Sequence, residues 1–105
     1  MDDIETIAMN LISHAGMARS LAFQALDEAK KGNFSKADEL MAESDKEQLE
    51  AHQVQTAALT REARGEKMDL CLLMVHAQDH LMHAMSYEQN VRDLIRLYKH
   101  LAVND

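Results

Sequence analysis

Four side chains able to hold a proton, a phosphoryl group or a metal ion lie in one short segment: His76, Asp79, His80 and His83. Spacings of three, four and seven residues place such side chains on one side of an α-helix, within reach of one another. A neutral imidazole is both a nucleophile and a ligand for transition metals. If the segment is helical, the cluster predicts either covalent chemistry on a histidine or a metal site.

The metal hypothesis uses the histidines as a group. His76 and His80 are four residues apart and could share a Zn²⁺ ion, with Asp79 or His83 as a further ligand. No second segment supplies the Glu-x-x-His pattern of di-iron bundles. A non-catalytic helical-bundle adaptor with a His/Asp metal site therefore stays open. It would need His76 and His80 together, whereas a nucleophilic carrier needs His76 alone.

The composition favours a protein built from helices alone. The chain has 105 residues, no proline, three glycines and 4% aromatic residues, which excludes a β-sandwich or barrel and allows one domain over residues 1–105. Eighteen acidic against 11 basic residues give a net charge of -7, which opposes nucleic-acid binding. Cys71 has no partner for an internal disulfide and no signal peptide is recognisable, so we expect a cytoplasmic protein.

Sparse turn signals divide the chain into three helices, expected at about residues 3–31, 36–64 and 70–101. Asp2, Ser35 and Asp69 are the expected N-caps. Gly32 and Gly65 mark the two links. Short links between long helices predict an all-α, antiparallel up-down-up three-helix bundle.

The second of these helices carries polar residues on its apolar side, namely Ser44, Gln48, His52 and Gln55. They are either partly solvated or members of a hydrogen-bonded network that lines an interface.

The third helix has two apolar seams on nearly opposite sides. The first seam faces the other two helices and consists of Leu70, Leu73, Ala77, His80, Ala84, Tyr87, Val91, Leu94, Tyr98 and Leu101. The second seam consists of Met68, Leu72, Val75, Asp79, Met82 and Ser86. A membrane span is disfavoured because Gln78, Asp79 and the histidines interrupt the apolar run. Since three helices cannot cover both sides of one of them, we expect the second seam to pack against copies of itself.

Three residues gain a specific meaning from this geometry. His80 falls on the first seam and is expected as a hydrogen-bonded core residue, whereas His76 lies on the flank between the seams, at the mouth of a groove between subunits. His76 is there either a reactive nucleophile or merely an interface histidine. Asp79 in the middle of the second seam either fixes the register or joins its copies around a cation such as Mg²⁺ or Ca²⁺.

The segment from Leu73 to Met82, Leu-Met-Val-His-Ala-Gln-Asp-His-Leu-Met, resembles the signature of the lactose/cellobiose-type enzyme IIA of the bacterial sugar phosphotransferase system. Residues 15–20, 31–34 and 50–56 agree with the same family, so the resemblance covers nearly the whole chain. It implies a homotrimer of three-helix bundles. It also implies that His76 accepts a phosphoryl group from the phosphocarrier HPr and transfers it to a cysteine of the cognate IIB component.

The resemblance extends to a metal and to a substrate class. It places Asp79 at the threefold axis, where three copies share a divalent cation, usually Mg²⁺. The transfer would energise uptake of a β-linked disaccharide of the cellobiose, chitobiose or lactose class through the membrane permease IIC. Which sugar is transported cannot be read from a IIA chain, because the permease selects it. A regulatory relative without phosphotransfer is a further alternative, but its mark would be a changed residue at position 76.

Supporting roles follow from the same comparison. We expect the phosphoryl group on Nε2 of His76, with Nδ1 held by a hydrogen bond. Gln78 and His80 are candidate supports of the ring. Leu72, Leu73 and Val75 are candidates for an apolar patch that docks the partner proteins. The family commonly has Thr or Ser where this chain has His83, which either alters the electrostatics of the phosphoryl site or is a neutral change at its rim.

Overall fold

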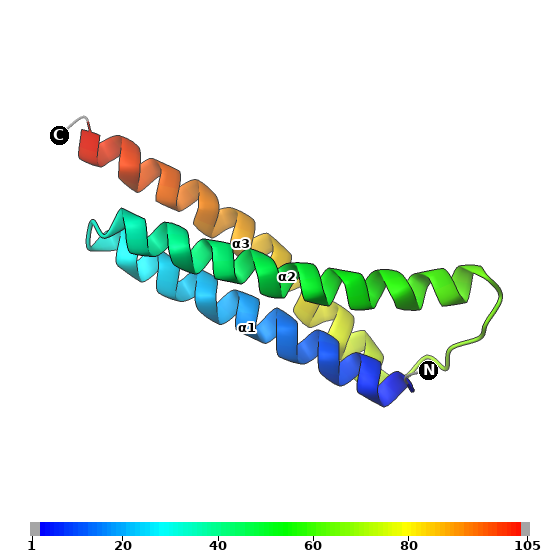
Figure 1. The fold of residues 1–105 in the computed structure, drawn as a ribbon. Coiled ribbons are helices and arrows are strands. Elements are labelled where there is room, and N and C mark those ends of the chain that lie inside the picture. The colour runs from blue at the N-terminus through cyan, green and yellow to red at the C-terminus, as the bar shows by residue number, and fades with distance from the viewer. Residues whose placement is uncertain (1–2, 104–105) are drawn as a thin grey trace.

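The computed structural model describes residues 3–103. Its three helices are α1 (Ile4–Lys30), α2 (Phe34–Ala63) and α3 (Leu72–Val103), and none of the described residues lies in a strand. The helices run up, down and up in a rod of 57 × 20 × 19 Å (Figure 1). The predicted all-α antiparallel bundle is therefore confirmed, with the helix bounds shifted by one or two residues. Within the described part of the chain, no helix combines the length and apolar character needed to cross a bilayer.

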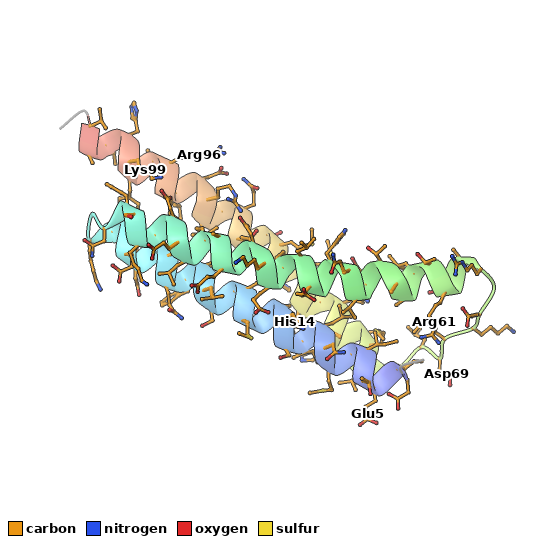
Figure 2. The ribbon with its side chains drawn as sticks, viewed as in Figure 1. Glu5, His14, Arg61, Asp69, Arg96 and Lys99 are labelled. Carbon is orange, nitrogen blue, oxygen red and sulfur yellow. The ribbon has the colours of Figure 1, made fainter. Side chains whose placement is uncertain are left out.

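The helix starts differ from the predicted caps. Asp3 caps α1, and its carboxylate accepts the Thr6 backbone N–H at 2.8 Å, whereas the predicted Asp2 lies outside the described residues. Ser35 is not a cap, because α2 already begins at Phe34. Gly32, with a φ of +84°, makes the turn between α1 and α2. The predicted cap Asp69 was also wrong: it lies in the connector between α2 and α3 (Figure 2), three residues before α3 begins.

Alanines on α1 form the centre of the core. Leu11 and six buried alanines point inward from this helix: Ala8, Ala15, Ala18, Ala22, Ala25 and Ala29. Their small side chains let α2 and α3 both approach α1 closely, while α2 and α3 make far fewer close approaches to each other. The helix α1 is thus the common partner of the other two.

The interface between α2 and α3 is bridged by polar side chains. Four pairs cross it: Asp38 with Lys99 at 2.9 Å, Ser44 with Glu88 at 2.8 Å, Asp45 with Arg92 at 2.6 Å, and Gln55 with Gln78 at 2.7 Å. Lys99 extends from the C-terminal part of α3 (Figure 2). Long polar side chains span a wider gap than alanines can, which accounts for the looser approach of these two helices.

The two alternatives for the polar residues of α2 each hold in part. Ser44 and Gln55 belong to the hydrogen-bonded network across the interface between α2 and α3. His52 is exposed to solvent. Gln48 fits neither description, because Nε2 and Oε1 of its amide are buried without a hydrogen-bond partner among the described residues.

The buried stripe of α3 confirms part of the first seam. Ala77, Ala84 and Val91 are buried as predicted. Leu70 is 86% exposed because it precedes the helix, and Leu94 and Leu101 also face solvent. The buried residues that the heptad pattern missed are Leu81, Glu88 and Ile95. They lie one position beyond His80, Tyr87 and Leu94, so the stripe is centred slightly to one side of the predicted seam.

The second seam is uncovered in the single chain. Leu72 is 83% exposed, Val75 49% and Met82 54%, and Asp79 and Ser86 also face solvent. Met68 is the exception, because it is half-buried and packs against the core cluster around Leu11 and Leu81. An apolar helix face of this length is left for another molecule to cover.

Candidate functional site

His76 and His80 face one another near the start of α3. Their Nε2 atoms are 3.0 Å apart, and their rings meet edge to face with centroids separated by 4.5 Å. His76 is exposed and His80 is half-buried. The prediction that His80 is a core residue was therefore wrong. A helix turns about 100° per residue, so residues i and i+4 share a face, and His80 follows His76 instead of the buried stripe.

The contact between the two imidazoles requires complementary tautomers. A hydrogen bond between two Nε2 atoms requires that one ring donates its N–H and the other accepts with its lone pair. Among the described residues, Nδ1 of His76 has no hydrogen-bond partner, so the expected fixing of the ring at Nδ1 is not found. The ring is instead held at Nε2, by His80.

Asp79 and His83 form a second pair beside the first. Nε2 of His83 lies 3.2 Å from Oδ1 of Asp79, and both side chains point into solvent, with 70% and 65% of their areas exposed. The predicted cluster of four residues is thus divided into an imidazole pair and an acid–imidazole pair. His83 is directed towards the second seam and Asp79, so the structure does not bring it against His76.

Gln78 is directed towards α2. Its Oε1 accepts a hydrogen bond from Nε2 of Gln55 at 2.7 Å, and its own Nε2 lies 3.7 Å from the sulfur of Met74. These contacts place the side chain of Gln78 in the interface between α2 and α3, away from the ring nitrogens of His76. Gln55 was not among the predicted site residues, although its polarity on an apolar face had marked it as a network member.

An apolar depression lies next to the histidine pair and is lined by Leu72, Leu73 and His76. Leu72 and Val75 are exposed as a docking surface requires. Leu73 is half-buried and packs partly against the core, so it contributes only one edge.

The possible metal ligands of one chain do not form a three-ligand site among the described residues. Within residues 3–103 of one chain, no three His, Cys, Asp or Glu side chains gather around a common point. Asp79 nevertheless has the donor type of a magnesium ligand, since hard carboxylate oxygens suit Mg²⁺ and its side chain is open to a neighbouring molecule. A site at Asp79 needs the same residue from other copies.

Fold and site together define a helical protein that presents a hydrogen-bonded histidine pair beside an apolar depression, an arrangement suited to carrying a group on an imidazole nitrogen. The family model for the lactose/cellobiose-specific IIA subunit of the PTS system matches residues 6–99. This chain belongs to that family of phosphotransferase-system components, as its signature segment predicted.

Three relatives show how similar the chain is to known members. It is 47% identical over 87 residues to the galactose-specific EIIA component of Lactococcus lactis subsp. cremoris strain MG1363, covering 83% of this chain and 75% of the relative. The crystal structure of the cellobiose-specific enzyme IIA from Bacillus anthracis has a TM-score of 0.95 and 42% identity, covering 100% and 96% of the two chains. The IIA(chitobiose) of Escherichia coli, solved in complex with HPr, has a TM-score of 0.83 and 40% identity, covering 97% and 99%.

Proposed function

We propose that this chain is a cytoplasmic phosphocarrier that accepts a phosphoryl group from phospho-HPr on His76 and passes it to a cysteine of the cognate IIB component. The observation that carries the proposal is the exposed side chain of His76, whose Nε2 is held 3.0 Å from Nε2 of His80 in a chain of the IIA family. The complex of the Escherichia coli IIA(chitobiose) with HPr supports the choice of donor.

His80 acts in this mechanism as a support for the reacting ring. When Nε2–H of His80 donates to Nε2 of His76, the lone pair of His76 lies at Nε2 and the ring is fixed. That lone pair attacks phosphorus in line as the N–P bond of the donor histidine breaks and its electron pair returns to the donor imidazole. The N–H of His80 is then available to a phosphoryl oxygen, which disperses the charge of the transferred group.

The second transfer reverses these roles. The thiolate of the IIB cysteine attacks phosphorus, the N–P bond of His76 breaks, and the electron pair returns to Nε2, where the hydrogen bond from His80 re-forms. Leu72 and Leu73 line the depression beside His76, and we propose that both partners dock there in turn. Contacts over such a small patch are weak, which suits a relay that must release each partner.

We further propose that three copies assemble through the second seam, with Asp79 of each copy at a common axis. The exposed Val75 and Met82 supply the apolar contact, and the carboxylates meet between them. Three carboxylates at one axis repel one another, so a divalent cation, Mg²⁺ by donor type, would be held by Asp79 and would neutralise them. The role of such a cation at this position would be to hold the three copies together.

The transported substrate is proposed as a β-linked disaccharide of the cellobiose, chitobiose or lactose class, entering through IIC. The family description and the relatives support this class. In this scheme the chain contacts phosphoproteins, and the sugar is bound by IIC.

Intact mass spectrometry tests the carrier function. The protein is incubated with phosphoenolpyruvate, enzyme I and HPr, alongside His76→Gln and, as a matched control, His83→Gln. We expect an acid-labile gain of about 80 Da in the wild type and in His83→Gln, and no gain in His76→Gln. A folded wild type that gains no mass, or a His76→Gln variant that still does, would contradict the proposal.

A further inference from the structure

The same imidazole pair has the geometry of a chelating metal site. Zinc–nitrogen bonds are about 2.0–2.1 Å long, so two nitrogens 3.0 Å apart subtend an angle of about 94° at an ion bound to both. This is close to the angle between adjacent ligands of a six-coordinate ion and somewhat below the tetrahedral value. The separation of the two Nε2 atoms therefore suits a two-nitrogen chelate, in which each ring turns to direct its Nε2 lone pair at the ion.

We propose that His76 and His80 together bind a divalent transition-metal ion, with Zn²⁺ as the probe, and that this ion excludes the phosphoryl group from His76. The first half of the proposal stands on the geometry alone, and the second half rests on the proposed function. Histidines four residues apart on a helix are an established chelating arrangement, because the backbone holds both on one face. Solvent reaches His76, so water can complete the coordination shell.

The proton balance allows the exchange. In the neutral pair, one ring carries its proton on Nε2 and shares it with the other. Metal binding needs both lone pairs at Nε2, so that proton moves to Nδ1 of the same ring through water, and no proton is released. A net charge of -7 on the chain favours the approach of a dication.

The neighbouring pair of Asp79 and His83 differs in chemistry. It offers one imidazole and one carboxylate, and those two groups are already bonded to each other at 3.2 Å. Two imidazoles prefer Zn²⁺ or Ni²⁺ over Mg²⁺, whereas carboxylate oxygens prefer Mg²⁺. The two pairs should therefore be separable by the choice of metal and by mutation.

The consequence for phosphotransfer is direct. Nε2 of His76 has one lone pair, which either bonds to phosphorus or coordinates the ion. A bound ion also removes the hydrogen bond between the two rings. Binding of the metal and acceptance of the phosphoryl group are thus mutually exclusive at this nitrogen.

Isothermal titration calorimetry with Zn²⁺ tests the site on four proteins: the wild type, His76→Gln, His80→Gln and His83→Gln as the matched control. We expect one ion per chain in the wild type, at least a tenfold weaker affinity in either variant of the pair, and a change of less than twofold in His83→Gln. Imidazole ¹⁵N spectra should show the shift at Nε2 of His76 and His80. Absence of binding, one ion per three chains, or loss in His83→Gln with retention in His80→Gln would overturn the proposal.

A second measurement tests the competition. Purified phospho-HPr is mixed with the unphosphorylated protein with and without saturating Zn²⁺, and EDTA is then added. The stability of phospho-HPr in Zn²⁺ alone serves as the control. We expect at least a tenfold slower gain of phosphate with Zn²⁺ and recovery with EDTA, whereas an unchanged rate would overturn the competition. If the chain accepts no phosphate even without metal, the carrier function fails, while calorimetry still decides whether the metal site exists.

Discussion

At the scale of single residues, the pairing of His76 with His80 sets the state of the reacting nitrogen. An isolated surface imidazole divides its proton between two nitrogens and rotates freely. The 3.0 Å contact between the Nε2 atoms removes that freedom for His76. The cost of losing this support should appear in the rate of transfer, since the acceptor itself is unchanged.

Replacing His80 tests this support. We expect His80→Ala to slow phosphoryl acceptance from phospho-HPr about 10- to 100-fold in single-turnover measurements, because ring orientation and one donor to the phosphoryl oxygens are lost. The final mass gain should remain, since His76 is still present. His80→Gln should recover part of the rate, because its amide N–H can donate. Equal rates in all three proteins would remove His80 from the mechanism.

Gln48 gives a second prediction at this scale. Both polar atoms of its amide are buried without a partner among the described residues, a costly arrangement for a core position. We expect Gln48→Met, which has a similar length, to raise the free energy of unfolding by about 1 kcal/mol. Urea unfolding followed by circular dichroism measures the change, and an unchanged or lower stability would contradict the prediction.

At the scale of helices, the interface between α2 and α3 depends on a buried acid. Oε2 of Glu88 lies 2.8 Å from the hydroxyl of Ser44, which also lies 2.7 Å from the carbonyl oxygen of Ala18. The single hydroxyl proton can satisfy only one of these acceptors. A protonated Glu88 can donate to the hydroxyl and leave Ser44 free to donate to α1, so protonation completes the network.

The pH dependence of stability follows from this acid. Burial raises the pKa of Glu88 above its ordinary value of 4.5, and the carboxylate of Asp45 raises it further, while the hydrogen bond with Ser44 and the charge of Arg92 oppose the shift. Since the folded state then binds the proton more tightly than the unfolded chain, the stability from this group is present below pH 4.5 and is lost as the pH rises through the folded-state pKa.

We expect Glu88→Gln to remove that loss. The difference in unfolding free energy between the variant and the wild type should grow in favour of the variant as the pH rises above 4.5, and then level off. Urea titrations at a series of pH values measure it. A difference that is independent of pH would show that Glu88 has an ordinary pKa in the folded protein.

Sequence patterns predicted the helices well and the contacts of single side chains less well. The spacing of Ala77, Ala84 and Val91 indicated the buried side of α3, because burial follows the helical period. The assignment of His80 failed since it lies at the edge of that stripe, where one residue of offset decides between core and surface. The division of the histidine cluster into two pairs depends on side-chain rotamers, which spacing does not specify.

The start of α3 shows the same limit at the level of an element. Asp69 has the residue type of a cap, and helix propensity alone would start α3 there. The connector instead continues to Cys71, whose carbonyl oxygen accepts the first helical hydrogen bond, from Val75, at 3.1 Å. Leu70 and Leu72 are left exposed beside the second seam and the docking depression.

At the scale of the whole molecule, the second seam is the feature that one chain cannot explain. Its apolar residues lie on α3 on the side away from the core, and a carboxylate interrupts them at Asp79. Scattered exposed apolar residues are normal on any protein, but a row at helical spacing is typical of an interface between copies. The proposed assembly through this row would also set the surroundings of His76, which lies on its flank.

A pair of methionines allows a matched test of that assembly. Met82 lies on the second seam with 54% exposure, and Met9 lies on α1 with 52% exposure. A glutamate at either position would therefore be about equally exposed to water in the single folded chain. Three copies of an unpaired glutamate would face one another in Met82→Glu, which should weaken the trimer at least about 100-fold, whereas Met9→Glu should not affect it. Light scattering should therefore give three times 11.9 kDa for Met9→Glu and a single 11.9 kDa chain for Met82→Glu at low micromolar concentration. Unchanged helicity by circular dichroism would show that the loss is one of assembly, and a trimer that survives in Met82→Glu would place the interface on another face of the molecule.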